Sequence, residues 1–150
     1  MIIYIGADHG GFALKEQLKT VLSGDGYEVV DMGAAALTPD DDYPDYAKLV
    51  AAKVSEAPSS ARGILICRSG AGVDIVANKF LDVRSALAIS TDQVYQARHD
   101  DDVNVLSIAV DFTDPEAVLK MIKIFLSTPF ATEVKYTRRL QKISVIEANR

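Results

Sequence analysis

A glycine-rich turn around the single cysteine of the chain has the composition of an acid–base site. The turn reads Cys67-Arg68-Ser69-Gly70-Ala71-Gly72. Its glycines allow successive backbone N–H groups to converge, which favours bound negative charge. Cys67 could therefore move a proton, with the enolate-like product held by the amides of the turn and by the Ser69 hydroxyl. The alternative is that Cys67 is a small core residue that closes an apolar strand.

Both histidines of the chain lie beside aspartates. Asp8 precedes His9, and His99 precedes Asp100 and Asp101. If these segments converge, His9 can contact an anion or a hydroxyl, and Asp8 can orient a substrate hydroxyl. A metal site of two histidines and a carboxylate is an alternative, but the spacing matches no known ligand motif, so we expect no metal and no cofactor. Asp8 is explained equally well as a surface cap of the first helix.

The elements that must position these residues alternate between two hydrophobic periods. Short β-rich apolar segments are followed by stretches with apolar residues at helical spacing. We expect strands at 2–5, 28–32, 63–67, 83–89 and 103–110, and helices at 12–22, 46–54, 73–80, 92–98 and from Thr113 onward. This alternation predicts an α/β fold, a three-layer α/β/α sandwich around a doubly wound, five-stranded parallel sheet. Ligands bind at the carboxyl ends of such strands, where the Asp8 and Cys67 segments fall.

Length and composition favour one soluble domain over residues 1–150. Hydrophobic residues make up 49% of the chain and charged residues 25%, a mixture that can bury a full core. The lone cysteine excludes an internal disulfide, and no apolar run approaches the roughly 20 residues of a membrane span. The first residues lack the basic flank of a secretory signal. We therefore expect a cytoplasmic protein without a membrane partner.

The charge is distributed unevenly. The net charge is −5, which does not favour a nucleic-acid partner, yet residues 135–150 carry five cations against one carboxylate. These cations suit an anionic ligand or an acidic neighbouring surface, and the alternative is a solvated helix face. An extra helix at about 132–148 also carries an apolar stripe, formed by Tyr136, Leu140, Ile143 and Ile146. We expect this helix to pack on a second subunit, with packing on its own sheet as the alternative.

Five motifs, in order along nearly the whole chain, resemble the family of type B ribose-5-phosphate isomerases and galactose-6-phosphate isomerases. They are Gly6-Ala7-Asp8-His9-Gly10-Gly11-Phe12, Asp42-Tyr43-Pro44-Asp45-Tyr46-Ala47, Gly63-Ile64-Leu65-Ile66-Cys67, Gly70-Ala71-Gly72 with Ala77-Asn78-Lys79, and Asn104-Val105-Leu106. The resemblance implies a Rossmann-like subunit and a homodimer, or a tetramer, with active sites shared between subunits. It also implies a small-molecule sugar or sugar phosphate as the partner, and aldose–ketose isomerisation without metal or cofactor.

The resemblance also implies roles for single residues. Cys67 falls on the position that carries the proton between C1 and C2. Ser69 and the amides of Gly70, Ala71 and Gly72 fall where the cis-enediolate is stabilised. Asp8 and Tyr43 match sugar contacts, and His9 matches a contact to the phosphate.

Several positions depart from the family pattern. The family's ring-opening histidine falls at Asp100, with His99 one residue early, and the asparagine beside it falls at Asp101. A phosphate-binding arginine falls at Asp111, and the glycine after the cysteine is Arg68. The two arginine positions of the C-terminal helix hold Lys135 and Arg139.

Carboxylates thus replace hydrogen-bond donors where a sugar phosphate would bind. Arg68 or Arg138 could compensate by presenting a bidentate guanidinium to the phosphate. Alternatively, the substrate is a shorter or unphosphorylated sugar, with Asp100 as the group that opens its ring. A third reading is a family member that binds such a ligand without turnover.

Overall fold

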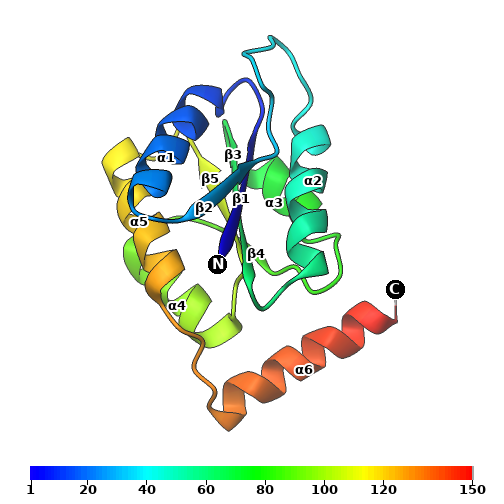
Figure 1. The fold of residues 1–150 in the computed structure, drawn as a ribbon. Coiled ribbons are helices and arrows are strands. Elements are labelled where there is room, and N and C mark those ends of the chain that lie inside the picture. The colour runs from blue at the N-terminus through cyan, green and yellow to red at the C-terminus, as the bar shows by residue number, and fades with distance from the viewer. Residues whose placement is uncertain (150) are drawn as a thin grey trace.

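The computed structural model describes residues 1–149 as a three-layer α/β/α sandwich, which confirms the predicted fold class. Five parallel strands pair in the order β2-β1-β3-β5-β4 (Figure 1). The strands are β1 (Ile2–Ala7), β2 (Glu28–Asp31), β3 (Ala61–Cys67), β4 (Ser85–Leu87) and β5 (Val105–Ala109). The helices are α1 (Phe12–Gly24), α2 (Tyr43–Glu56), α3 (Ala71–Ala77), α4 (Thr91–Asp101), α5 (Pro115–Ser127) and α6 (Val134–Ala148).

The central strand β3 separates two apolar cores because its side chains alternate between the faces of the sheet. Ile64 and Ile66 pack with residues of α1, α4 and α5, whereas Leu65 and Cys67 pack with residues of α2 and α3. Every residue of β3 is buried. The side chain of Cys67 therefore points to the α2/α3 face, at the carboxyl end of the sheet.

Helix α6 lies beneath the sheet instead of covering one of its faces (Figure 1). Tyr136 is the one buried residue of this helix, and Ile143, Val145 and Ile146 are exposed. The alternative that α6 packs on its own sheet does not hold for most of the helix, so its apolar stripe lacks a cover within the described part of the chain. None of the helices formed by residues 1–149 combines the length and the apolar character that crossing a membrane requires.

The turn between β3 and α3 depends on a left-handed backbone at Gly70, whose φ is 71°. A Cβ atom at this position would lie 2.4 Å from Cδ1 of Leu87 and 3.0 Å from the backbone nitrogen of Ala109. Gly70 is thus required both by conformation and by the close approach of strands β4 and β5.

We predict that Gly70→Ala lowers the free energy of unfolding by about 2–5 kcal/mol, because it combines a strained left-handed residue with overpacking. Gly26→Ala is the matched control, since Gly26 has a φ of 89° but open space around its Cα. The control isolates the conformational cost, about 1 kcal/mol. Urea unfolding of both variants checks the prediction, and equal losses would contradict the role assigned to packing around Gly70.

Candidate active site

Two glycine-containing turns meet at the carboxyl ends of neighbouring strands. Ala7 at the end of β1 is the register partner of Ile66 in β3, so Asp8 and Cys67 each follow a paired residue. Gly11 allows the turn after β1 to approach the end of β3, because a Cβ at Gly11 would lie 2.7 Å from the carbonyl oxygen of Ile66. The predicted proton carrier and the predicted sugar contact are thereby brought to one place.

The sulfur of Cys67 is held by the turn that follows it. The backbone N–H of Gly70 donates a hydrogen bond to Cys67 Sγ over 3.1 Å. Cys67 is only 4% exposed, as the core alternative predicted, while Ser69 in the same turn is exposed. A sulfur that accepts a backbone hydrogen bond and is largely shielded from water is suited to exchange a proton with a bound substrate.

The aromatic ring of Tyr43 closes the side of this turn. A Cβ on Gly72 would lie 2.5 Å from Cζ of Tyr43, so the ring lies directly against the glycine backbone. Tyr43 remains 38% exposed, which leaves part of the side chain available to a ligand. The structure thus brings Tyr43 to the Cys67 turn.

The loop after β1 holds an acid and a histidine in fixed positions. Asp8 is buried and accepts a hydrogen bond from the N–H of Gly11 over 3.2 Å, so it is not the surface cap offered as an alternative. His9 contacts Asp41, which lies in the loop before α2. Sequence reasoning did not identify Asp41, because 32 residues separate the two partners.

Arg68 and Asp111, the two departures nearest to Cys67, form an ion pair. Arg68 Nε donates to Asp111 Oδ2 over 2.8 Å. The pairing continues the β3–β5 ladder, since the N–H of Asp111 donates to the carbonyl oxygen of Arg68. The stem of Arg68 crosses Gly10, where a Cβ would lie 2.4 Å from Arg68 Cγ. The guanidinium is therefore held beside the Asp8–His9 loop.

The remaining predicted residues form a second cluster, at the end of α4 and the start of α6. His99 Nδ1 lies 2.7 Å from Asp100 Oδ1, and the imidazole stacks on Tyr95 at 5.2 Å between ring centroids. The ring of Tyr136 lies edge-on to His99, at 5.8 Å. Lys135 and Arg139 lie over the Tyr136 ring, at 4.4 and 5.7 Å from its centroid; no other cation–π contact involves α6 within residues 1–149.

The electrostatics of this cluster separate its two carboxylates. The hydrogen bond to His99 lowers the pKa of Asp100, and Tyr136 and Lys135 act in the same direction. Burial raises the pKa of Asp101, and the negative charge of Asp100 adds to this effect. Asp100 is therefore the more readily ionised of the pair.

The two clusters lie at opposite ends of the sheet. Cys67 pairs with Ala109 at the carboxyl end of β5, whereas α4 ends at Asp101, just before β5 begins at Val105. Four residues of strand separate the two ends by about 13 Å, and α6 lies beneath the sheet at the amino end (Figure 1). One chain therefore brings neither His9 and His99 together nor Asp100 to Cys67.

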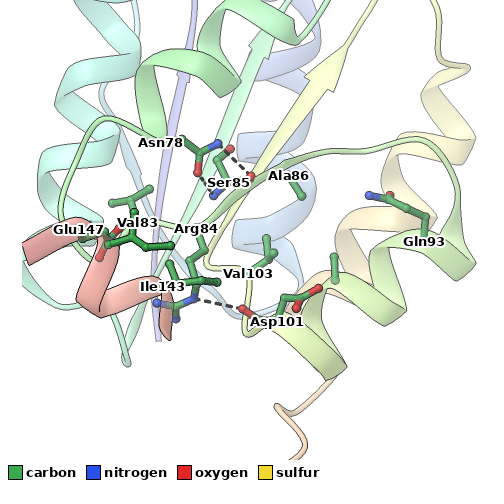
Figure 2. Close-up of a pocket in the computed structure, with 12 residues that line it drawn as sticks. Asn78, Val83, Arg84, Ser85, Ala86, Gln93, Asp101, Val103, Ile143 and Glu147 are labelled. Carbon is green, nitrogen blue, oxygen red and sulfur yellow. Dashed lines mark hydrogen bonds between the residues drawn. The ribbon is translucent and has the colours of Figure 1, made fainter. Parts of the chain in front are cut away.

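A cavity of about 450 Å³ lies at the amino end, between the β4 edge, α4 and α6 (Figure 2). Asp101 is the only predicted site residue that lines it. Arg84 Nε donates to the backbone carbonyls of Asp101 and Asp102, and Ser85 pairs with Asn78 through backbone and side-chain hydrogen bonds. These polar groups bind one another and support the fold. A smaller cavity of about 350 Å³, lined mostly by apolar groups, lies beside Ser69 at the carboxyl end.

Within residues 1–149, no group of three histidine, cysteine or carboxylate side chains is placed to hold a metal ion. Each cluster instead joins a histidine to an aspartate, with cations nearby. These groups can exchange protons and bind an anionic or hydroxyl-rich ligand.

Comparison with known proteins identifies the family. The family model described as Ribose/Galactose Isomerase matches residues 3–143. A probable ribose-5-phosphate isomerase B of Mycoplasma pneumoniae is 39% identical over 97% of this chain and 94% of its own length. The ribose-5-phosphate isomerase B of Mycolicibacterium paratuberculosis is 32% identical over 98% of this chain and 92% of its own.

Solved structures agree with these matches. The ribose-5-phosphate isomerase B of Mycoplasma genitalium, crystallised with bound ribulose-5-phosphate, superposes with a TM-score of 0.96 at 36% identity over 99% of this chain and 97% of that one. The Clostridium thermocellum enzyme gives 0.93 at 33% identity over 99% of both chains. The chain therefore belongs to the ribose/galactose isomerase family, the sugar-phosphate isomerase family that its motifs resemble, and it is an isomerase.

Proposed function

We propose that the protein interconverts ribose 5-phosphate and ribulose 5-phosphate through a cis-enediolate, with Cys67 as the proton carrier. The observation that carries this proposal is the placement of Cys67 Sγ on the N–H of Gly70, beside the Asp8–His9 loop. Relatives that are similar over nearly the whole chain are named ribose-5-phosphate isomerase B, which supports the choice of substrate.

The proposed reaction moves two protons and leaves no net charge. The Cys67 thiolate takes the proton from C2 of the open-chain aldose, and the C2 electron pair forms the double bond of the enediolate. The thiol, whose proton exchanges with solvent while the enediolate is bound, then protonates C1, while a second proton moves from the oxygen on C2 to the oxygen on C1. The hydroxyl of Ser69 and the amides of Gly70, Ala71 and Gly72 stabilise the enediolate oxygens.

Each active site is proposed to combine the Cys67 cluster of one subunit with the His99 cluster of another. The separation of the two clusters within one chain supports this arrangement, as does the uncovered apolar stripe of α6. We propose a homodimer related by two-fold symmetry, in which the α4–α6 region of one subunit lies over the Cys67 turn of the other.

The His99–Asp100 pair is proposed as the unit that opens the sugar ring. Asp100 occupies Nδ1 of His99, which leaves Nε2 as the ring nitrogen that exchanges a proton with the substrate. The family's ring-opening histidine falls at Asp100, one residue after His99. We propose that His99 keeps the ring-opening role and that Asp100 orients its imidazole. Lys135 and Arg139 on the adjacent turn of α6 supply positive charge for the phosphate. Asp101, beside Asp100, is proposed to contact a hydroxyl.

A second candidate is isomerisation, or binding without turnover, of a different or unphosphorylated sugar. The carboxylate of Asp111 favours it, because it occupies the guanidinium of Arg68 and places negative charge near the proposed phosphate end. Coupled assays with phosphorylated and free tetroses, pentoses and hexoses distinguish the candidates. Preference for a free sugar would overturn the phosphate assignment, and turnover of any sugar would exclude the non-catalytic alternative.

The proposed setting is the cytoplasm, with a small-molecule partner and no nucleic acid.

We predict that Cys67→Ala reduces kcat for ribose 5-phosphate about 100- to 10,000-fold, because the proton carrier is lost. Ser60→Ala is the control, since Ser60 is exposed at the amino end of β3 and lies outside the proposed site. Steady-state kinetics and urea unfolding of both variants check this result. A Cys67→Ala protein that folds and retains kcat within a few-fold of the parent would contradict the assignment.

We predict that two inactive variants restore each other. Cys67→Ala and the double variant His99→Ala/Asp100→Ala are each expected to be inactive, because each lacks one half of the site. Mixed in equal amounts and reassembled, they should recover about one quarter of parental activity, since half of the dimers then hold one intact site of two. The parent protein, dissociated and reassembled in the same way, gives the reference. No recovery, with mixed dimers shown to form, would mean that the two clusters do not act at one site.

A further inference from the structure

His9 is fixed by an aspartate that no motif indicated. Its backbone N–H donates to Asp41 Oδ1 over 2.7 Å, and its ring nitrogen Nδ1 lies 2.8 Å from the same oxygen. These two contacts hold both the backbone and the ring of His9 against the loop before α2. Because Nδ1 is occupied, Nε2 is the ring nitrogen left for a ligand.

Asp41 is placed to act through its charge. Its side chain is 7% exposed, and its second oxygen, Oδ2, is buried without a hydrogen bond of standard geometry, although the Tyr46 hydroxyl is near enough to interact with the carboxylate. A buried carboxylate requires a compensating positive partner. Burial pushes the pKa of Asp41 upward, but its hydrogen bonds, chiefly with His9, outweigh burial and lower it.

The same contact favours the charged form of His9. The hydrogen bond to Asp41 raises the pKa of His9 against the opposing effect of burial, and the nearby charge of Asp8 adds to the increase. Arg68 brings a second positive group to this corner, because its stem lies on Gly10, next to His9. Its hydrogen bond to Asp111 uses Nε, which leaves the N–H groups of the two terminal nitrogens as further donors.

We propose that Asp41 is a positioning residue that holds His9 as an imidazolium, with Nε2–H directed at the phosphate of the substrate. This inference rests on the proposed function and names the group that gives His9 its charge. Asp41 does not touch the substrate. Arg68, held by Asp111, supplies the second donor to the same phosphate.

The pH dependence follows from the groups around His9. Asp8 comes from its own loop, Asp41 from the loop before α2, Tyr46 from α2 and Arg68 from the β3–α3 turn. A raised pKa keeps His9 protonated up to a higher pH. Phosphate binding through Nε2–H is therefore present below that pKa and is lost as the pH rises through it.

The first test compares Asp41→Asn with Asp40→Asn. Asp40 is an exposed neighbour in the same loop, and its φ of 59° suits asparagine, so this control removes an equal charge. We expect Asp41→Asn to raise KM for ribose 5-phosphate about tenfold at pH 7 with kcat within about twofold, and to move the rise of KM to lower pH. Asp40→Asn should leave both unchanged. An unchanged KM and pH profile in Asp41→Asn would overturn the proposal.

A second test uses the two histidines as NMR probes. Titration should show a lower His9 pKa in Asp41→Asn than in the parent, and in a His9→Asn background Asp41→Asn should have no further effect on KM. An unshifted His9 pKa, or an equal loss of affinity without His9, would mean that Asp41 is merely structural. Asp41→Glu, which keeps the charge, should restore part of the His9 shift.

Inorganic phosphate separates this inference from the proposed function. If the parent protein does not turn over ribose 5-phosphate, the proposed function fails. The phosphate affinity is read from the concentration that half-saturates the shift of the His9 resonance. The Asp41 inference then stands if this concentration is about tenfold higher in Asp41→Asn than in the parent. Equal phosphate affinity in the two proteins would overturn it.

Discussion

The hydrogen bond from the Gly70 N–H to Cys67 Sγ is the contact on which the proposed chemistry depends. It forms because β3 ends at Cys67 on the α2/α3 face and the chain turns at once through the left-handed backbone of Gly70. A side chain at position 70 would clash with Leu87 and Ala109, so this turn requires glycine. Packing of the neighbouring strands thus fixes the sulfur next to the amides that would stabilise the negative charge on the substrate in the transition state.

The second constraint is the length of the sheet. The five residues of β5 span about 13 Å, so this strand separates Ala109, beside Cys67, from the end of α4. Helix α6 extends the amino-end cluster and presents Ile143 and Ile146 to solvent within the described chain. If the two clusters act at one site, as proposed, they must come from two copies of the chain.

The sequence predicted the fold well because hydrophobic period and turn residues are local properties. The strands at 2–5 and 63–67 lie within the observed ones, and the helix expected from Thr113 onward begins at Pro115, with Asp114 as its N-cap. The predicted strand 83–89 proved to be three residues long, Ser85–Leu87, and it lies at the edge of the sheet, where it pairs only with β5. Apolar character alone does not reveal that a strand lies at the edge of a sheet.

The sequence indicated those site residues that lie in local motifs. Motif order indicated Asp8 and Cys67, and register explains why they meet. Contacts between distant segments were not visible: Asp41 reaches His9 across 32 residues, and Arg68 reaches Asp111 across 43. Arg68 and Asp111 each depart from the family pattern, and the structure joins them in an ion pair. Residues 40–42 are all aspartates, so the sequence does not distinguish Asp41 from its neighbours. Only the folded structure shows that the Asp41 side chain is buried.

The most direct test of the account follows the hydrogen on C2 of ribose 5-phosphate by proton NMR in deuterated water. The account predicts that the parent protein replaces this hydrogen with deuterium and that folded Cys67→Ala leaves it in place. Undiminished exchange by Cys67→Ala would contradict the account, because another group would then be carrying the proton.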